Sequence, residues 1–176
     1  LSDKIINCNY LIELFGNAKT QRNDNSSRFG KFIKLYVDNN NIVGANINNY
    51  LLEKSRISST DRSEKTYHIF YLLTDKYREL SEYGFKKTQE YRVLHQSDYK
   101  HIIDEFTDLN RFFMIMKQFN FTDYEQQLII YKMQLILELL NITCKEELIA
   151  FIEKSDKLLK KLCINKDDLW CILTQK

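Results

Sequence analysis

Nine consecutive residues combine side chains suited to phosphate and metal chemistry: Asn23-Asp24-Asn25-Ser26-Ser27-Arg28-Phe29-Gly30-Lys31. The adjacent hydroxyls of Ser26 and Ser27 could serve a hard cation such as Mg²⁺, which prefers oxygen ligands and keeps several waters. The amides of Asn23 and Asn25 could reach phosphate oxygens or an attacking water. Arg28 could hold a carboxylate through two parallel hydrogen bonds, a geometry that Lys cannot copy. Together these are the parts of a loop that senses a nucleotide.

The same residues also suit a plain solvated turn. Clusters of Asn and Ser beside glycine are common in turns, and short motifs arise easily by chance. Composition alone favours the turn, so the flanking sequence has to decide.

Histidine and cysteine offer little further chemistry. His68, His95 and His101 do not form H-E-x-x-H, and the four cysteines (Cys8, Cys144, Cys163, Cys171) form no C-x-x-C pair. A zinc site is therefore not expected, and reduced cytosolic thiols are favoured. His68 lies between apolar neighbours, and no nucleophile or acid is spaced to serve it. We expect a partly buried structural histidine rather than a catalytic one.

The composition describes one compact unit with a real core. The 176 residues are 44% hydrophobic and 28% charged. The net charge of +2 is too small and too dispersed to predict nucleic-acid or anionic-membrane binding. We see no secretory signal, and Lys132, Gln134 and Glu138 interrupt the most apolar stretch, so no transmembrane segment is expected. The chain starts at Leu1 inside a helical pattern, which suggests a piece of something longer.

The elements that position the loop are a helix before it and a β-hairpin after it. The helix is expected from about Asp3 to Phe15, ending at Gly16 in a left-handed stop. Its buried side should carry Ile5, Ile6, Leu11, Ile12 and Phe15.

The hairpin is expected from the alternation of apolar Ile33, Leu35 and Val37 with polar residues. Asn39-Asn40-Asn41 should form the turn, because Asn tolerates left-handed backbone angles. Residues 42–56 should return as the second strand, with Glu53-Lys54-Ser55-Arg56 as the charged end of the hairpin.

Helices should fill the rest of the chain. Helical spacing predicts one helix over residues 65–83 and another over about 108–119, beginning at Thr107 or Asp108. A third helical run covers residues 143–154. The stripe Phe112, Phe113, Met116 and Phe119 could form a docking groove, but core packing is favoured. Capping boxes are expected at Thr122 with Glu125, Thr143 with Glu146, and Asn165 with Asp168.

The succession of motifs resembles the myosin motor domain. The loop reads N-x-N-S-S-R-F-G-K, as myosin switch I does, and it lies between F-G-N-A-K-T at residues 15–20 and Y-L-L-E-K-S-R at residues 50–56. Kinesins share S-S-R but follow it with Ser-His, so Phe29-Gly30-Lys31 points to myosin. The resemblance is dense from about Ile5 to Leu73 and thinner to the end of the chain.

The resemblance implies a role for each residue of the loop. Ser27 would ligate Mg²⁺, and Ser26 would contact the lytic water and the γ-phosphate of ATP. Asn23 would touch the nucleotide phosphates, with Asn25 supporting the loop beside them. Arg28 would close over the site by pairing with a glutamate of switch II.

The resemblance also implies a fold and partners. The fold would be mixed α/β, mainly α-helical with a β-hairpin, as a fragment of the myosin P-loop NTPase motor fold. Residues 1–58 would hold switch I and the transducer hairpin, and residues 59–176 would form a helical part of the upper actin-binding subdomain. The parent would be an actin-based, ATP-driven motor on the cytoplasmic cytoskeleton. Its partners would be actin filaments, the rest of the motor domain and, through regions outside this chain, light chains.

Two features of the sequence bear on catalytic activity. The chain contains no G-x-x-x-x-G-K-[ST] phosphate loop and no D-x-x-G-F-E switch II, so Arg28 has no obvious partner and the chain alone should not hydrolyse ATP. Where myosins commonly read I-L-H-L-G-N-I, residues 136–142 read I-L-E-L-L-N-I. A non-catalytic, myosin-like scaffold or actin-interaction module is therefore the alternative.

Overall fold

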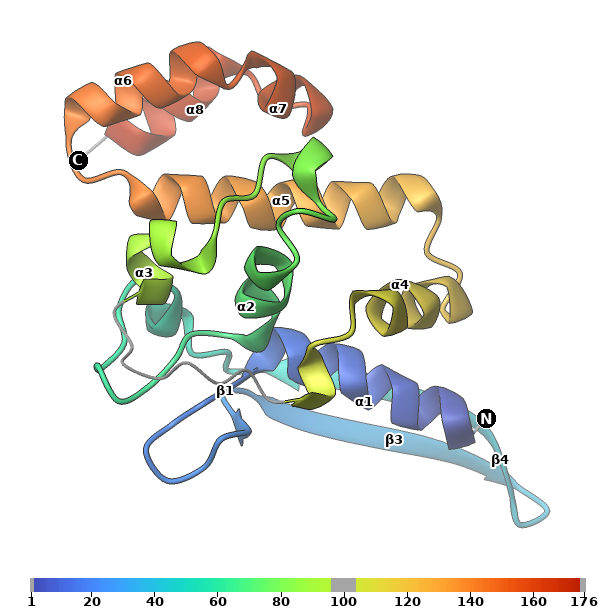
Figure 1. Ribbon diagram of the computed structural model, residues 1–176. Helices are drawn as coiled ribbons and strands as arrows, with labels where there is room; N and C mark the ends of the chain where they lie inside the picture. The colour runs from blue at the N-terminus through green and yellow to red at the C-terminus, as the bar shows by residue number, and fades with distance from the viewer. Residues whose placement is uncertain (1, 96–103, 175–176) are drawn as a thin grey trace.

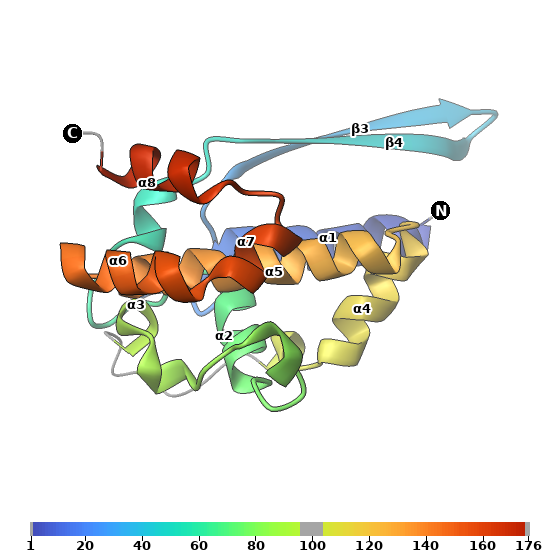
Figure 2. The same cartoon turned by 90° about the horizontal axis from the view of Figure 1, so that it is seen from above.

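A computed structural model describes residues 2–95 and 104–174 of the chain. Figure 1 shows a helical body with a long β-hairpin beside its first helix. Helix α5 crosses the middle of the body, with helices α6 to α8 on one side and α1, α2 and α4 on the other. In the view from above, the hairpin extends along one side of α1 (Figure 2). The expected mixture of many helices and a small sheet is confirmed.

Helix α1 (Ser2–Gly16) leads into the loop, as expected. Its inward face differs from the expectation: Tyr10 and Leu14 are buried, whereas Ile6 is 61% exposed. The reason is that α1 packs against α2 and α4, which selects the face carrying Asn7, Tyr10 and Leu14 at helical spacing. The amide of Asn7 donates to Gln118 Oε1 of α4 at 2.6 Å.

Gly16 ends α1 without the left-handed backbone that we expected, since the one described glycine with positive φ is Gly84. The close approach of the Phe29 ring to the backbone explains why a glycine occupies position 16. A Cβ added there would lie 2.5 Å from two ring carbons of Phe29. The ring of Phe29 therefore packs where any other residue would place its side chain.

Two antiparallel ribbons follow α1. Strands β1 (Asn17–Ala18) and β2 (Ser26–Ser27) pair with each other, and Ala18 also bridges to Tyr67. Strands β3 (Gly30–Asp38) and β4 (Asn41–Tyr50) form the expected hairpin, with a bulge at Tyr36/Val37. The turn residues Asn39 and Asn40 both have positive φ, at 46° and 62°, as the two-residue hairpin turn requires.

The second strand ends at Tyr50, so its expected extension to Arg56 is wrong. Leu51 turns the chain with a φ of 56°, a left-handed conformation that strands do not use. Residues Lys54–Ile57 then form the 3-10 helix η1. Arg56 is only 5% exposed and is not part of a solvated hairpin end.

The remaining chain is helical. Its elements are α2 (His68–Asp75), η2 (Ser81–Tyr83), η3 (Thr88–Glu90), α3 (Arg92–His95), η4 (Asp104–Phe106), α4 (Leu109–Gln118), α5 (Asp123–Asn141), α6 (Lys145–Lys154), α7 (Asp156–Lys161) and α8 (Lys166–Thr174). A single helix over residues 65–83 was wrong. Lys65 and Tyr67 are held in extended conformation by Lys19 and Ala18, so the helix begins at His68.

The helix caps agree with the sequence in part. Asp108 caps α4 by accepting from the N–H of Arg111, and Thr122 and Glu125 form the expected capping box of α5. The box expected at Thr143 is wrong: Thr143 donates from its N–H and hydroxyl to Glu147, not Glu146, and Cys144 is the N-cap of α6.

The core contains the aromatic stripe of α4. Phe112 and Met116 are buried, and Phe113 and Phe119 pack against the same cluster, so core packing is confirmed over a docking groove. A second, smaller cluster joins α5 to the last three helices. It consists of Leu135, Leu148, Ile152, Leu159 and Leu169.

Candidate functional site

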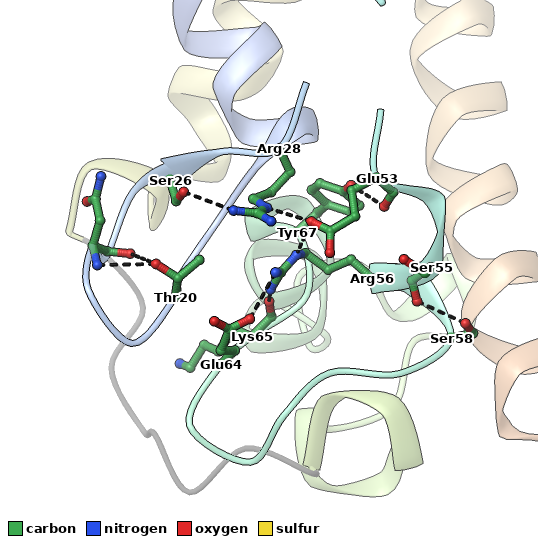
Figure 3. Close-up of polar contacts among 11 residues, drawn as sticks. Thr20, Ser26, Arg28, Glu53, Ser55, Arg56, Ser58, Glu64, Lys65 and Tyr67 are labelled. Carbon is green, nitrogen blue, oxygen red and sulfur yellow. Dashed lines mark hydrogen bonds and ion pairs between the residues drawn. The ribbon is translucent and has the colours of Figure 1, made fainter. Parts of the chain in front are cut away.

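The candidate loop lies between β1 and β2 and is closed by Thr20 and Asn23. The N–H of Thr20 donates to the carbonyl of Asn23 at 2.9 Å, and the N–H of Asn23 donates back to Thr20 Oγ1 at 3.2 Å. These bonds make a tight turn whose next segment, residues 26–28, runs back beside β1 (Figure 3). The serines are therefore held on paired backbone rather than on a free turn.

Asn25 fixes the inner side of the loop. Its Oδ1 accepts from Asn17 Nδ2 at 3.0 Å and lies 3.2 Å from His68 Nε2. Its Nδ2 donates to Glu13 Oε2 at 3.2 Å. These contacts fit the supporting role expected of Asn25 and tie the loop to both α1 and α2.

His68 is a structural residue, as expected. It is 3% exposed and stacks on Phe106 with ring centroids 4.8 Å apart. Burial, and then the charge of Lys65, lower its pKa from 6.5 to about 4. The imidazole is therefore neutral at pH 7 and serves the loop through Asn25. His101 lies outside the described residues.

Arg28 is held through both its backbone and its side chain. Its N–H donates to the carbonyl of Gly16, and its carbonyl accepts from the N–H of Glu53, each at 2.9 Å. Its Nε donates to Glu53 Oε2 at 2.5 Å, and its Nη1 donates to Ser26 Oγ at 3.3 Å (Figure 3). The expectation that Arg28 has no partner within this chain is therefore wrong.

Glu53 belongs to a larger charged cluster. Arg56 donates to Glu53 Oε2 through Nε at 2.9 Å, to Glu64 Oε2 through Nη2 at 2.9 Å, and to the carbonyl of Lys65 through Nη1 at 3.0 Å. Burial raises the pKa of Glu53, but hydrogen bonds and charges from Arg56 and Arg28 outweigh it, so the pKa lies below its usual value. Glu53 is therefore ionised at neutral pH.

Sequence reasoning missed the pairing of Arg28 with Glu53, although a signal was present. The hairpin pairs Gly30 with Tyr50, and continuing that register brings Arg28 next to the residues that follow β4. An acidic residue in the segment that follows β4 would therefore be expected to pair with Arg28.

Two lysines lie beside the loop and were not singled out from the sequence. Lys19 is buried and forms an ion pair with Asp24, whose side chain is 70% exposed. Lys65 is buried next to it, and its Nζ lies over the ring of Tyr71. Burial, and then the charge of Lys19, lower the pKa of Lys65 to about 8, so it is mostly charged at pH 7. The two cations favour anions nearby.

The side chains expected to meet a nucleotide differ in their surroundings. Asn23 and Ser27 are exposed, and Ser26 is half-buried. Ser26 Oγ accepts from Arg28, so its own O–H remains able to donate. Ser27 offers an exposed hydroxyl oxygen on β2. This donor set suits a hard cation and phosphate oxygens, so the residues fit their expected share of a Mg·ATP site.

Other site classes find little support in the part of the chain that the structure describes. Within residues 2–95 and 104–174 no three His, Cys, Asp or Glu side chains gather to hold a metal ion. No helix in these ranges is long and apolar enough to cross a membrane.

Comparisons with known proteins agree with the motifs. A probable myosin heavy chain of Encephalitozoon cuniculi is 48% identical over 100 residues, which cover 55% of this chain and 6% of that protein. Myosin-1 of Aspergillus fumigatus and Myosin-1 of Aspergillus niger are each 38% identical over 152 residues, or 82% of this chain and 12% of those proteins. The chain thus spans 6–12% of the length of these curated relatives.

The family model of the myosin head (motor domain) matches residues 1–175, almost the whole chain. The match includes the paired loop that carries Ser26, Ser27 and Arg28, and also the last three helices, where the motif resemblance is thin. The chain belongs to the myosin head (motor domain) family.

Proposed function

We propose that this chain is one segment of an actin-based, ATP-driven motor, and that residues 23–28 are its switch I. The observation that carries the proposal is the arrangement of the loop: Ser26 and Ser27 on a paired strand, with Arg28 fixed at both backbone groups. A loop that orders against a metal ion and a terminal phosphate is a recurrent switching device.

Ser27 supplies its hydroxyl to Mg²⁺. Mg²⁺ bound there would neutralise charge on the phosphates, and phosphoryl transfer depends mostly on such positioning and charge stabilisation. The exposure of Ser27 leaves its oxygen accessible for this role.

Ser26 acts on the attacking water and the γ-phosphate, and Arg28 closes the loop over the site. Because Ser26 Oγ already accepts from Arg28, its O–H is directed to another acceptor, a phosphate oxygen or the attacking water. Asn23 contributes its amide to the nucleotide phosphates from the exposed side of the loop, and Asn25 supports the loop from inside. Arg28 keeps N–H donors for an acidic partner contributed by another part of the motor.

The remainder of the motor domain supplies what this chain lacks. The sequence of this chain contains neither the phosphate loop nor the switch II motif, so we expect the isolated chain to be inactive. In the P-loop NTPase motor fold, residues 1–58 would provide switch I and the transducer hairpin, and residues 59–176 part of the helical upper subdomain. The partners would be actin filaments on the cytoskeleton and, outside this chain, light chains.

A non-catalytic scaffold is the second candidate, because Glu138 and Leu140 depart from the myosin pattern. Helix α5 runs through Leu140, and Glu138 pairs with Lys86 at 2.9 Å. Against the scaffold, a loop that bound no nucleotide would have no chemical reason to keep two serines and an arginine in this order.

The test is the steady-state MgATP turnover of the complete motor, with and without actin filaments. Arg28→Ala should lower kcat by at least about 100-fold, because the loop would no longer be held closed over the site and a small misplacement of a reacting group costs about this much. Lys34→Ala on the exposed hairpin is the control and should keep normal turnover. Near-normal turnover by the Arg28 variant would refute the proposed role of the loop.

A further inference from the structure

We propose that Glu53 is a positioning residue of this site: acting through Arg28, it sets the orientation of Ser26. The inference rests on the proposed function, and it gives a specific role to a residue that the sequence placed only at the charged end of the hairpin.

Two bonds of different kinds join Glu53 to Arg28. The backbone N–H of Glu53 donates to the carbonyl of Arg28 at 2.9 Å, and the carboxylate accepts from Arg28 Nε at 2.5 Å. Because the two residues are joined through their backbones and also through their side chains, the Arg28 side chain cannot rotate away without breaking a charge-assisted hydrogen bond.

The bond to Nε determines what the rest of the guanidinium does. Because a guanidinium is planar and has five N–H groups in a fixed fork, fixing Nε also fixes the directions of the two terminal nitrogens. In this orientation Nη1 reaches Ser26 Oγ at 3.3 Å. The position of the Glu53 carboxylate therefore determines where Arg28 Nη1 contacts the hydroxyl of Ser26.

Glu53 is itself anchored from the far side. The hydroxyl of Tyr67, a residue 2% exposed at the start of α2, donates to the carbonyl of Glu53 at 2.7 Å. The same carboxylate oxygen that holds Arg28 also accepts from Arg56, which is held by Glu64 and the carbonyl of Lys65 (Figure 3). The carboxylate thus sits between a buried arginine and the loop arginine.

A purely structural role for Glu53 makes a different prediction. If Glu53 served only as the counter-ion of buried Arg56, then loosening Arg56 from its other side should have the same effect on the site. Glu64→Gln does that, because Glu64 contacts Arg56 and leaves the bond between Arg28 and Glu53 in place.

The experiment compares Glu53→Ala, Glu53→Gln, Arg28→Ala, the Arg28→Ala/Glu53→Ala double variant and Glu64→Gln in the complete motor. Steady-state MgATP turnover gives kcat and KM. Glu53→Ala should lower kcat by about 10- to 100-fold with little change in KM, because a small misplacement of a reacting group has an effect of this size. Glu53→Gln keeps an oxygen acceptor and should lose less.

The double variant should be no slower than Arg28→Ala alone, because Glu53 acts through Arg28, and Glu64→Gln should keep normal kcat. Equal losses in Glu53→Ala and Glu64→Gln would overturn the inference in favour of a counter-ion role. Normal kcat in Glu53→Ala beside a slow Arg28→Ala would overturn it while leaving the proposed function intact.

Hydrogen exchange over residues 20–31 provides a readout that does not need turnover. Glu53→Ala should speed exchange in this segment, and Glu64→Gln should leave it unchanged. If the unaltered motor hydrolyses no ATP, the proposed function fails, and this pattern still supports positioning by Glu53. Unchanged exchange in Glu53→Ala overturns the inference.

Discussion

At the scale of single residues, the loop is ordered by polar side chains that reach it from distant parts of the chain. Asn25 connects to α1 and α2, and Arg28 connects to the segment after the hairpin. Sequence motifs identified the loop residues themselves, because those are neighbours along the chain. They did not reveal Glu53 or His68 as partners, because those contacts exist only once the hairpin and α2 have folded beside the loop.

The buried histidine makes stability depend on pH. The pKa of His68 is lowered from 6.5 to about 4. Between pH 4 and pH 6.5, therefore, His68 is protonated in the unfolded chain and neutral in the folded chain. This contribution to stability is therefore complete above pH 6.5 and falls with pH toward 4, by up to about 1.4 kcal/mol per pH unit.

The free energy of unfolding, measured by denaturant titration at several pH values, tests this dependence. The slope between pH 6.5 and 4 should be shallower in His68→Gln than in the unaltered chain. Identical slopes would contradict a neutral, buried His68.

The contact between Gly16 and Phe29 should make Gly16→Ala destabilising. The new methyl group would meet two ring carbons at 2.5 Å, and overpacking of this kind typically costs about 1–3 kcal/mol. Gly44→Ala is the matched control, because its nearest neighbour atom lies at an ordinary 3.4 Å. Thermal unfolding of both variants measures the difference, and equal melting temperatures would show that Phe29 moves aside freely.

At the scale of elements, helices α4, α5 and α6 could be expected from the sequence, because apolar spacing and caps are local signals. Features that depend on distant contacts were missed. The start of α2 is set by Lys19 and Ala18, and the end of β4 by the left-handed turn at Leu51. The face that α1 buries was likewise selected by α2 and α4 rather than by its own apolar pattern.

The cap of α5 should contribute measurably to stability. Thr122→Ala removes the hydroxyl that accepts from the N–H of Glu125, and loss of such a cap costs about 1 kcal/mol. Thr122→Ser keeps the hydroxyl and should stay close to the unaltered chain. Denaturant unfolding gives the free energy of unfolding of the two variants. Equal losses of stability in Thr122→Ala and Thr122→Ser would contradict a contribution from the capping hydroxyl.

At the scale of the whole molecule, the hairpin of β3 and β4 leaves many apolar side chains in contact with solvent. Large apolar residues along it are exposed, among them Phe32 at 57%, Val37 at 62% and Val43 at 62%. Exposed apolar side chains on the long edge strands of a two-stranded ribbon favour association with another chain or aggregation.

The isolated 176-residue chain should therefore self-associate through the hairpin. Val37→Lys adds a charge among these apolar residues and should shift sedimentation toward the monomer. Asn46→Glu is the control, because it also adds a charge to the hairpin but places it opposite Lys34, in a setting that is already polar. A monomer at every concentration tested would contradict the prediction.

The central claim is that Ser27 gives its oxygen to the metal ion of a bound nucleotide. The most direct measurement is MgATP and MnATP turnover by the complete motor with Ser27→Cys, since sulfur ligands suit Mn²⁺ better than the hard Mg²⁺. Turnover should fall steeply with Mg²⁺ and recover substantially with Mn²⁺, while the unaltered motor works with both ions. Equal turnover of the variant and the unaltered motor in Mg²⁺, or a loss that Mn²⁺ leaves unchanged, would contradict direct coordination by Ser27.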